Sequence, residues 1–469
     1  PTPFAEFRTT ESSHLILEPD YLVDASAIAR CVDRYGRQSS YNYLLSNLRF
    51  FTGSEATFMG NLINEMLDQI IDNEHITYEQ AYRGALHKNF LEAVFLKDKL
   101  MLIYHNLKTQ FERLQQFVKK YRSQRLTTEP TFLSAIFGLQ GRLDVLVEYN
   151  ESNADQDRKN LKEIIELKSA KSVPPVRSKA WANDLVQVAC YNLLLDDTFE
   201  NRRGISAILY SQAEDGEYLR NCGKLNFEQQ DALLLRNQMV FLDFMIAREN
   251  TRIFDQLHKR ISQAGLPFYV VEDAKAFDDM WRGCREIDKA YFIAFAGLVV
   301  RENIAAKIGQ TQNDFQNGFA NLWKNAREDK KANFALLEQL TLDFEQSDLT
   351  TSTLVFHRQT NQSSVTTFRK GDIAVLYPIN ANGSLTALKY QLLKCNIAHI
   401  TPQQVTIQAW NKHIDAHFLQ QHTHWALEPN LLESGNRDLL ASLAYYLSIP
   451  DAQKDLLLGR RPPEFGPLP

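Results

Sequence analysis

The fold is decided by three short stretches: FGLQGRLDVLV at 137–147, EIIELKSAK at 163–171 and DLVQVACYNLLL at 184–195. The first predicts a hairpin that turns near Gly138 to Gly141, with apolar residues alternating along its second arm. The second is a short apolar strand, and the third has apolar residues at helical spacing. A further buried strand, GISAILYSQ at 204–212, follows. This order of strands and helix predicts an α/β core.

Charged residues interrupt these apolar strands at positions that suggest a metal site. Asp144 lies mid-strand in GRLDVLV, while Glu166 and Lys168 are two residues apart in IIELKS and therefore leave their strand on the same face. If the two strands pair, Asp144 and Glu166 can bind one divalent metal, with the backbone carbonyl of Leu167 as a third oxygen. Mg²⁺ prefers oxygen ligands and keeps several waters, so this set suffices. Lys168 would orient or deprotonate an attacking water and offset charge on a phosphate.

The helix that follows carries two further candidates. Gln187 and Tyr191 are four residues apart and share one helical face, from which both could reach a bound strand of nucleic acid. Taken alone, such a pair is as typical of an ordinary amphipathic helix as of a functional site. It is the order of the carboxylates, the lysine and this helix that favours a hydrolytic site.

The rest of the chain predicts further domains around this core. The first 130 or so residues are helical in pattern, and a helical pattern returns from Asn226 to about Gln346. Runs rich in β-branched residues after Thr350 predict a small barrel, and Asn436 to Ile449 predict a final helix. We therefore expect a core domain at 1–224, a helical linker and stalk at 225–348, a small β-barrel at 349–428, and a stalk helix with a lead-in to an absent motor domain at 429–469.

The three core stretches resemble the RecB-type branch of the PD-(D/E)xK nucleases, which have a restriction-endonuclease-like fold. FMGNLINEMLDQII at 58–71 resembles the upstream helix of that branch, where a metal-binding His follows a Gly by four residues. This chain has Gly60 but Asn64 at the place of the His. The resemblance implies a metal-dependent DNA nuclease that uses Mg²⁺ or Mn²⁺, with Asn64 as a weaker ligand.

Later stretches resemble the DNA replication ATP-dependent helicase/nuclease family. They are YFIAFAGLVVREN at 291–303, FRKGDIAVLYP at 368–378 and HWALEPNLLES at 424–434. This resemblance implies cleavage of single-stranded or flap DNA by the nuclease portion of a helicase–nuclease. The chain has no GxxxxGK[ST] loop, so we expect its helicase motor to follow in the same full-length polypeptide. Members of the family often carry an iron–sulfur cluster, but only Cys31 has a counterpart here, so no cluster is expected.

Two alternatives remain open at this point. The substitution at Asn64 also fits a catalytically weakened nuclease fold that acts as a DNA-binding or assembly module. A stand-alone restriction-like endonuclease fits less well, because no separate specificity domain is apparent. A group of four histidines at 413–424 could bind zinc, but no adjacent Cys supports that interpretation.

The composition is that of an ordinary globular protein, with 44% hydrophobic and 23% charged residues and a net charge of −5. DNA binding depends on local basic surface rather than on net charge. Two basic segments supply candidate contacts, namely Lys119, Lys120 and Arg122 in one and Lys171, Arg177 and Lys179 in the other. No apolar run is long enough for a membrane helix, and the five scattered cysteines contain no CxxC pair. We expect a cytoplasmic protein with no membrane partner.

Overall fold

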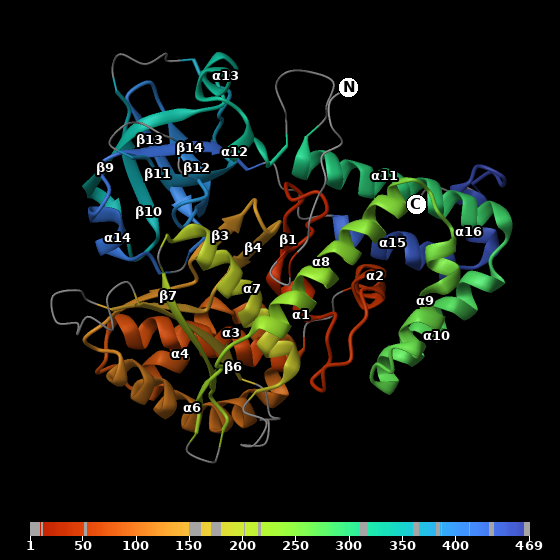
Figure 1. The fold of residues 1–469 in the computed structure, drawn as a ribbon, viewed down its shortest axis with the longest axis horizontal. Coiled ribbons are helices and arrows are strands. Elements are labelled where there is room, and N and C mark those ends of the chain that lie inside the picture. The colour runs from red at the N-terminus through yellow and green to blue at the C-terminus, as the bar shows by residue number, and fades with distance from the viewer. Residues whose placement is uncertain are drawn as a thin grey trace, which may run out of the picture.

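The computed structural model describes residues 10, 13–50, 54–149, 161–169, 180–200, 202–213, 217–309, 318–359, 365–380, 385, 387–411, 413–430 and 436–463. Figure 1 shows an α/β part with two sheets, a group of long helices and a closed six-stranded barrel. This arrangement confirms the predicted combination of an α/β part, linking helices and a small barrel. None of the helices in the described ranges is long and apolar enough to cross a membrane.

The strand predicted from EIIELKSAK lies at the centre of the larger sheet. Its strands lie in the order β2 (Arg125–Thr128), β5 (Val145–Glu148), β6 (Leu161–Lys168), β7 (Arg203–Tyr210) and β8 (Leu219–Asn221). Neighbours are antiparallel except β6 and β7, which are parallel because helix α7 (Ala182–Thr198) connects them across one face. Ile164 and Ile165, at the centre of β6, are both fully buried. Strand β6 is therefore covered on both faces.

A smaller sheet contains the predicted hairpin. Its strand order is β1 (Val23–Asp24), β4 (Leu139–Arg142) and β3 (Thr131–Ser134). The hairpin turns at residues 135–138, slightly earlier than expected. Gly138 ends this turn with a φ of 63°, a left-handed conformation that glycine adopts without strain.

The expectation that Asp144 lies in the middle of a strand is wrong. The chain leaves β4 after Arg142 and bends through Leu143 and Asp144 before it enters β5 in the larger sheet. Two backbone hydrogen bonds fix this bend. The Leu143 N–H donates to the Pro130 carbonyl at 3.1 Å, and the Glu129 N–H donates to the Asp144 carbonyl at 3.0 Å. Asp144 is therefore held at the junction of the two sheets.

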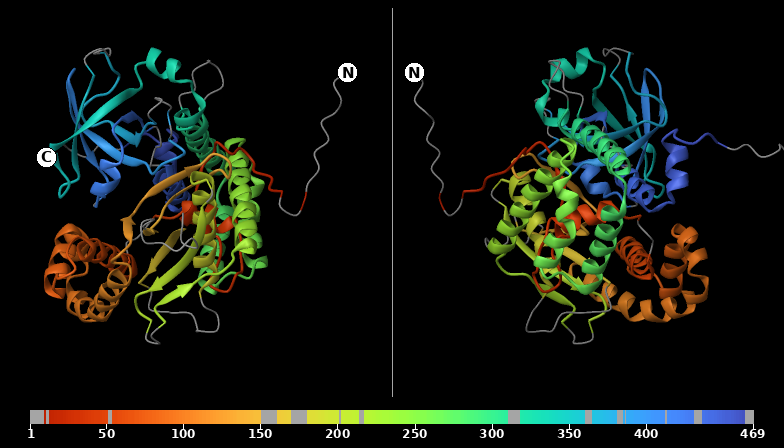
Figure 2. Two further views of the ribbon diagram at one scale, coloured as in Figure 1. Left: turned by 60° about the vertical axis from the view of Figure 1, so that its left-hand side comes forward. Right: turned by 90° about the vertical axis from the view of Figure 1, so that its right-hand side faces the viewer.

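Helices cover both faces of the larger sheet, as Figure 2 shows. One face is covered by α3 (Glu55–Asp72), α4 (Tyr78–Lys88), α5 (Phe90–Phe95), the 3-10 helix η1 (Lys97–Lys99) and α6 (Leu100–Lys120). The other is covered by α7, α1 (Ala25–Ala29) and α8 (Asn226–Ala247). The apolar spacings predicted for the stretches at 58–71 and 100–121 form the first of these interfaces.

A separate helical core links the two ends of the described chain. It contains α2 (Tyr41–Asn47), α9 (Arg252–Gln263), α10 (Phe268–Gly283), α11 (Glu286–Ile308) and α15 (Asn436–Ser448), and α16 (Asp451–Leu457) follows α15. Phe254, Trp281 and Phe292 pack at its centre, with ring centroids 5.1–5.6 Å apart. The helix predicted for Asn436 to Ile449 is confirmed.

The helical pattern expected through Gln346 is wrong from Leu337 onward. The short helices α12 (Asn321–Lys324) and α13 (Arg327–Ala332) are followed by strand β9 (Leu337–Asp348), the first strand of the barrel. Leu340, Leu342 and Phe344 alternate with polar residues along β9, which is the period of a strand. The barrel therefore begins about a dozen residues earlier than predicted.

The barrel closes around one apolar core. Its remaining strands are β10 (Thr353–His357), β11 (Ile373–Pro378), β12 (Leu393–Ile400), β13 (Gln404–Ala409) and β14 (Trp425–Pro429), with helix α14 (Ala416–Gln420) between the last two. Inward-facing residues such as Leu393 and Cys395 are buried, whereas Lys394 and Asn396 between them point outward. This alternation leaves one polar outer face of the barrel next to the α/β part.

Specific polar contacts fix the barrel to the α/β part. The Leu392 N–H donates to the Thr131 carbonyl at 2.9 Å. Arg125 of β2 forms an ion pair with Asp415 at 2.5 Å, and His413 forms one with Asp72 of α3 at 2.8 Å. The barrel is thus held against both the small sheet and the helix that carries Asn64.

Candidate active site

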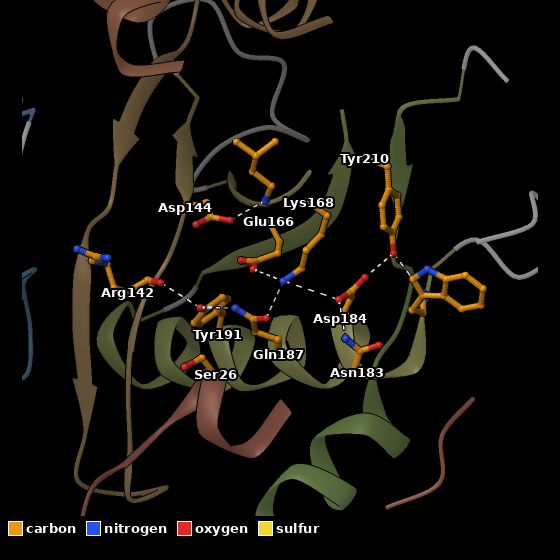
Figure 3. A network of polar contacts seen from close by, with 12 residues as sticks. Ser26, Arg142, Asp144, Glu166, Lys168, Asn183, Asp184, Gln187, Tyr191 and Tyr210 are labelled. Atoms are coloured by element: carbon orange, nitrogen blue, oxygen red, sulfur yellow. Dashed lines mark hydrogen bonds and ion pairs between the residues drawn. The ribbon is translucent and has the colours of Figure 1, made fainter. Parts of the chain in front are cut away.

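The candidate carboxylates lie on neighbouring strands of the larger sheet. Strands β5 and β6 are antiparallel with Val145 opposite Ile165, so the next position along places Asp144 beside Glu166. The Leu167 N–H donates to Oδ2 of Asp144 at 2.7 Å, across the same gap (Figure 3). Because the N–H and C=O of a strand residue point toward the same neighbouring strand, the Leu167 carbonyl also faces Asp144.

Burial makes this pair of carboxylates electrostatically costly. The pKa of Glu166 is raised by burial and then by the negative charge of Asp144. The pKa of Asp144 is also raised, mainly by burial, although the charge of Lys168 and the Leu167 N–H oppose the shift. One carboxylate oxygen of Glu166, Oε2, is buried and has no hydrogen-bond partner in the described part of the chain. The pair therefore favours a bound proton or a cation.

Lys168 supplies a fixed positive charge beside the pair. Its Nζ donates to Oε1 of Glu166 and to Oε1 of Gln187, both at 2.9 Å, and lies 3.7 Å from Asp184. Burial lowers the pKa of Lys168, but the charges of Glu166, Asp184 and Asp144 more than offset this and raise it overall. Lys168 is therefore held as a cation, and of the two roles expected for it, orienting water and offsetting charge fits better than taking up a proton.

Helix α7 positions the remaining polar groups from one face. Nε2 of Gln187 donates to the Tyr191 hydroxyl at 2.9 Å, and that hydroxyl donates to the Arg142 carbonyl at 3.0 Å. A Cβ at Gly141 would lie 2.8 Å from the Tyr191 ring, so only glycine lets β4 approach this closely. The structure thus brings Glu166, Lys168, Gln187 and Tyr191 into one connected network, and Asp144 lies beside it, bonded to the Leu167 N–H (Figure 3).

Sequence reasoning missed Asp184. It lies three residues before Gln187 in the first turn of α7 and is buried. Its Oδ2 accepts from the Tyr210 hydroxyl at 2.8 Å, and its Oδ1 faces Lys168. The spacing of three residues from Gln187 was the available signal, because residues three apart share a helical face.

Asn64 lies close to the network without joining it. Asn64 is half-buried on α3, one turn after Gly60. A Cβ built at Gly60 would lie 3.5 Å from the Ser169 hydroxyl, which follows the end of β6. One turn beyond Asn64, Asp68 faces Thr128 and Glu129, next to the bend that holds Asp144. Within the described ranges, the Asn64 side chain makes no hydrogen bond with either carboxylate of the pair.

The basic candidates lie elsewhere or outside the described residues. Lys119, Lys120 and Arg122 are at the C-terminal end of α6, next to Tyr121, which bonds Glu163 near the start of β6. Lys168 is five positions after Glu163 along the strand, a span of roughly 17 Å. Arg122 also forms an ion pair with Glu74 at 2.7 Å. Lys171, Arg177 and Lys179 lie outside the described residues.

The donor set fits a hydrated divalent cation better than a closed metal site. No group of three or more His, Cys, Asp or Glu side chains in the described ranges is arranged to hold a metal. The two carboxylates, the unpartnered Oε2 of Glu166 and the Leu167 carbonyl together offer oxygen ligands to an ion that keeps several waters, such as Mg²⁺ or Mn²⁺. The five cysteines are free thiols.

Three of the four histidines near the end of the barrel, His413, His417 and His422, contact separate partners. His413 pairs with Asp72, and Nε2 of His417 lies 2.9 Å from the Gln421 amide. The His422 ring packs edge-on against Phe418 and Trp425. Nothing in these contacts favours a zinc site.

Comparison with known proteins relates the N-terminal region to one family. The family described as DNA replication factor Dna2 matches residues 5–130, which confirms the expected resemblance over that range. Residues 5–130 are consistent with the N-terminal region of a Dna2-like helicase/nuclease. The matched range includes Gly60 and Asn64 but ends before Asp144 and Glu166.

The comparisons with curated proteins and with solved structures do not relate the chain to a further family. No curated protein matches the chain. Among solved structures, one match is a flavohemoglobin from Malassezia yamatoensis with bound FAD and heme. It is 13% identical, covers 58% of this chain and 67% of that chain, and has a TM-score of 0.18, which is too low to support a statement about the fold.

Asp68, one turn beyond Asn64, provides a test of this electrostatic environment. Burial raises the pKa of Asp68 from 3.8 to about 7; Glu129 and Glu65 also raise it, whereas Thr128 and His413 lower it. A raised acid pKa means that the charged form destabilises the fold, so the penalty is absent near pH 3, grows between pH 4 and 7, and is complete above 7. Asp68→Asn should therefore raise the free energy of unfolding at pH 8 by on the order of 2–4 kcal/mol and much less at pH 4.5.

Chemical denaturation at the two pH values measures this difference, with the exposed Asp98→Asn as the matched control. Equal stabilisation at both pH values, or destabilisation at pH 8, would show that Asp68 does not carry a buried charge.

Proposed function

We propose that the chain is a metal-dependent PD-(D/E)xK nuclease that cleaves single-stranded or flap DNA as the nuclease portion of a helicase–nuclease. The observation that carries the proposal is the position of the Lys168 ammonium, held at 2.9 Å from both Glu166 and Gln187 beside the Asp144–Glu166 pair. A structural ion pair needs one carboxylate, whereas this cluster gathers three around a single lysine, two of them buried and Asp144 half-buried. Such a concentration of perturbed groups is typical of active sites.

The proposed site would hold the cation between Asp144, Glu166 and the Leu167 carbonyl. A bound Mg²⁺ or Mn²⁺ would supply Lewis acidity, which lowers the pKa of a coordinated water and offsets charge on the phosphate. The residues of the chain provide the remaining functions. Lys168 faces the same space as a permanent cation and stabilises negative charge that develops on the phosphate oxygens.

The polar residues of α7 keep this arrangement rigid. The side-chain oxygen of Gln187 accepts a hydrogen bond from the Lys168 ammonium and so fixes its position. The Gln187 amide is in turn oriented by the hydrogen bond that its nitrogen donates to the Tyr191 hydroxyl. Burial raises the pKa of Tyr191, so its hydroxyl stays protonated and serves as a donor. Asp184 holds the opposite side of the ammonium and acts as a positioning residue.

The match to the Dna2 family supports DNA as the substrate and a helicase–nuclease as the setting. On this proposal, the helicase motor is supplied by further sequence in the same polypeptide or by a partner. An alternative is a catalytically weakened nuclease fold that binds DNA or organises an assembly. The absence of a hydrogen bond between Asn64 and the carboxylate pair in the described part of the chain favours that alternative, so the two must be separated by experiment.

Lys168→Ala separates catalysis from binding. The variant keeps both carboxylates but loses the fixed cation, so cleavage of labelled single-stranded and flap DNA in Mn²⁺ should fall by about 10²–10³-fold. DNA affinity, measured without metal, should change little, because most attraction to the backbone comes from many basic residues. The exposed Lys224→Ala is the matched control and should cut like the wild type.

A wild-type rate of cleavage in Lys168→Ala would exclude this lysine from the mechanism. If the wild-type chain binds DNA but cuts none in Mn²⁺ or Mg²⁺, the binding-module alternative replaces the nuclease proposal.

Asn64→His tests the role of α3. Imidazole is a stronger metal ligand than a carboxamide, so the variant should reach half-maximal cleavage at a lower Mn²⁺ concentration, by on the order of tenfold. A titration of cleavage rate against Mn²⁺ measures the shift, with the exposed Ala56→His, about two turns earlier on the same helix, as control. An unchanged Mn²⁺ requirement would show that position 64 does not reach the metal.

A further inference from the structure

A polar pocket lies where the outer face of the barrel meets the small sheet of the α/β part. Its volume is about 300 Å³, and its walls include Gly141 and Arg142 of β4, Lys394 and Trp410 of the barrel, and Asp24. Neither Lys394 nor Trp410 belongs to the network around Lys168. The pocket lies beside the Thr131–Leu392 contact that joins the barrel to β3, and Thr131 also lines it.

Lys394 is a half-buried cation, and no counter-charge among the described residues is in contact with it. Cys395 pairs with Ala409 across β12 and β13, so Lys394 lies opposite Trp410 on the outer face. In the described part of the chain, the Lys394 ammonium makes no hydrogen bond or ion pair. Burial lowers the pKa of Lys394; the charge of Asp24 partly offsets this, and the nearby Arg142 lowers it further. A half-buried cation in this state costs stability unless an anion joins it.

Arg142 adds a second cation to the same pocket. Its side chain is 59% exposed, and the ion pair that it forms with Glu129 has the long distance of 3.4 Å. The acidic wall residue, Asp24, is already engaged, because its Oδ1 accepts from both the N–H and the hydroxyl of Ser26 at the start of α1. The two cations therefore favour binding of an anion in the pocket.

Trp410 presents an aromatic face beside these cations. The side chain is 47% exposed, although an indole normally favours burial. Its Nε1 donates to Oδ1 of Asn396 at 2.5 Å, and its backbone N–H donates to the Lys394 carbonyl at 2.8 Å. These bonds fix the ring by its edge and leave a face free to stack on a planar group.

The pocket and the candidate active site share strand β4. Tyr191 donates to the backbone carbonyl of Arg142, whose side chain lines the pocket, and Asp144 follows two residues later. Two residues span at most roughly 7 Å, so the backbone of Asp144 stays within about one phosphate spacing of Arg142 although the chain bends there. A polymer bound in the pocket would therefore lie next to the carboxylates.

We propose that this pocket binds one nucleotide of single-stranded DNA, with its phosphate at Lys394 and Arg142 and its base stacked on Trp410. The identity of the polymer rests on the proposed nuclease function, but the pocket itself rests on the geometry of β4, β12 and Trp410. A phosphate provides the anion that Lys394 lacks, and every base has a flat face that an exposed tryptophan can hold.

Lys394→Met gives this proposal a distinctive signature. Methionine fills similar space without charge, so removing an unpartnered half-buried cation should raise thermal stability while weakening DNA binding. A lysine with a merely structural role would show the opposite effect on stability. Lys389→Met on the exposed surface of the barrel is the matched control and should change neither quantity appreciably.

The test is fluorescence anisotropy of a short labelled oligo(dT) bound to the full chain in EDTA, where no cleavage occurs. Lys394→Met should weaken binding and reduce the slope of log K against log salt by about 0.7, the value for one phosphate contact on a single strand. Trp410→Ala should weaken binding roughly tenfold or more, the loss typical of one stacked base, whereas Trp410→Phe should retain most of it. An abasic strand of equal length should bind wild type and Trp410→Ala alike.

The outcomes distinguish this proposal from the proposed function. If Lys394→Met and Trp410→Ala bind oligo(dT) as tightly as wild type, with an unchanged salt slope, the pocket proposal is overturned and the nuclease proposal stands. If these variants lose affinity but the wild type cuts no DNA in Mn²⁺, the pocket stands and the nuclease proposal fails. Loss of stability in Lys394→Met would also overturn the pocket assignment, because it would show that the cation supports the fold.

Discussion

The pairing of β5 with β6 is the constraint on which the candidate site depends. The register that sets Val145 opposite Ile165 leaves Asp144 beside Glu166 at the point where β5 begins. Apolar clusters cover both faces of this sheet, so the two carboxylates cannot separate into water without disrupting either core. Burial is the largest cause of the raised pKa of each carboxylate, and the negative charge of Asp144 raises the pKa of Glu166 further. The fold thus creates a position where a cation is favoured.

The surrounding elements complete that position from different parts of the chain. Because β6 and β7 are parallel, the connection between them must cross one face, and α7 makes that crossing. Its Asp184 and Gln187 are directed at Lys168, and its Tyr191 contacts Gln187 (Figure 3). Strand β4 approaches α7 closely enough for the Arg142 carbonyl to accept a hydrogen bond from the Tyr191 hydroxyl. This approach is possible because residue 141 is glycine. The barrel in turn packs against β3 and β4. The same short strand therefore connects the network of the candidate active site with the pocket of Lys394 and Trp410.

The parts that were predictable from the sequence are those governed by local periodicity. Charged residues within apolar strands at a spacing of two marked Glu166 and Lys168, and a spacing of four on a helix marked Gln187 and Tyr191. The bend at Asp144 was missed because it depends on backbone contacts with Glu129 and Pro130. The strand from Leu337 was assigned to a helix because its alternation is confined to a few residues within a polar segment. Asp184 and Lys394 gain their significance only from residues distant in sequence, which a local pattern does not reveal.

The central claim is that the Asp144–Glu166 pair holds a divalent cation beside Lys168. The most direct measurement is an anomalous difference map from crystals of the chain grown with Mn²⁺. The account predicts a peak at ligand distance, about 2.1–2.2 Å, from a carboxylate oxygen of each residue, with the Leu167 carbonyl as a third protein ligand. A well-ordered map with no Mn²⁺ at this pair, or with Mn²⁺ bound only elsewhere on the chain, would contradict it.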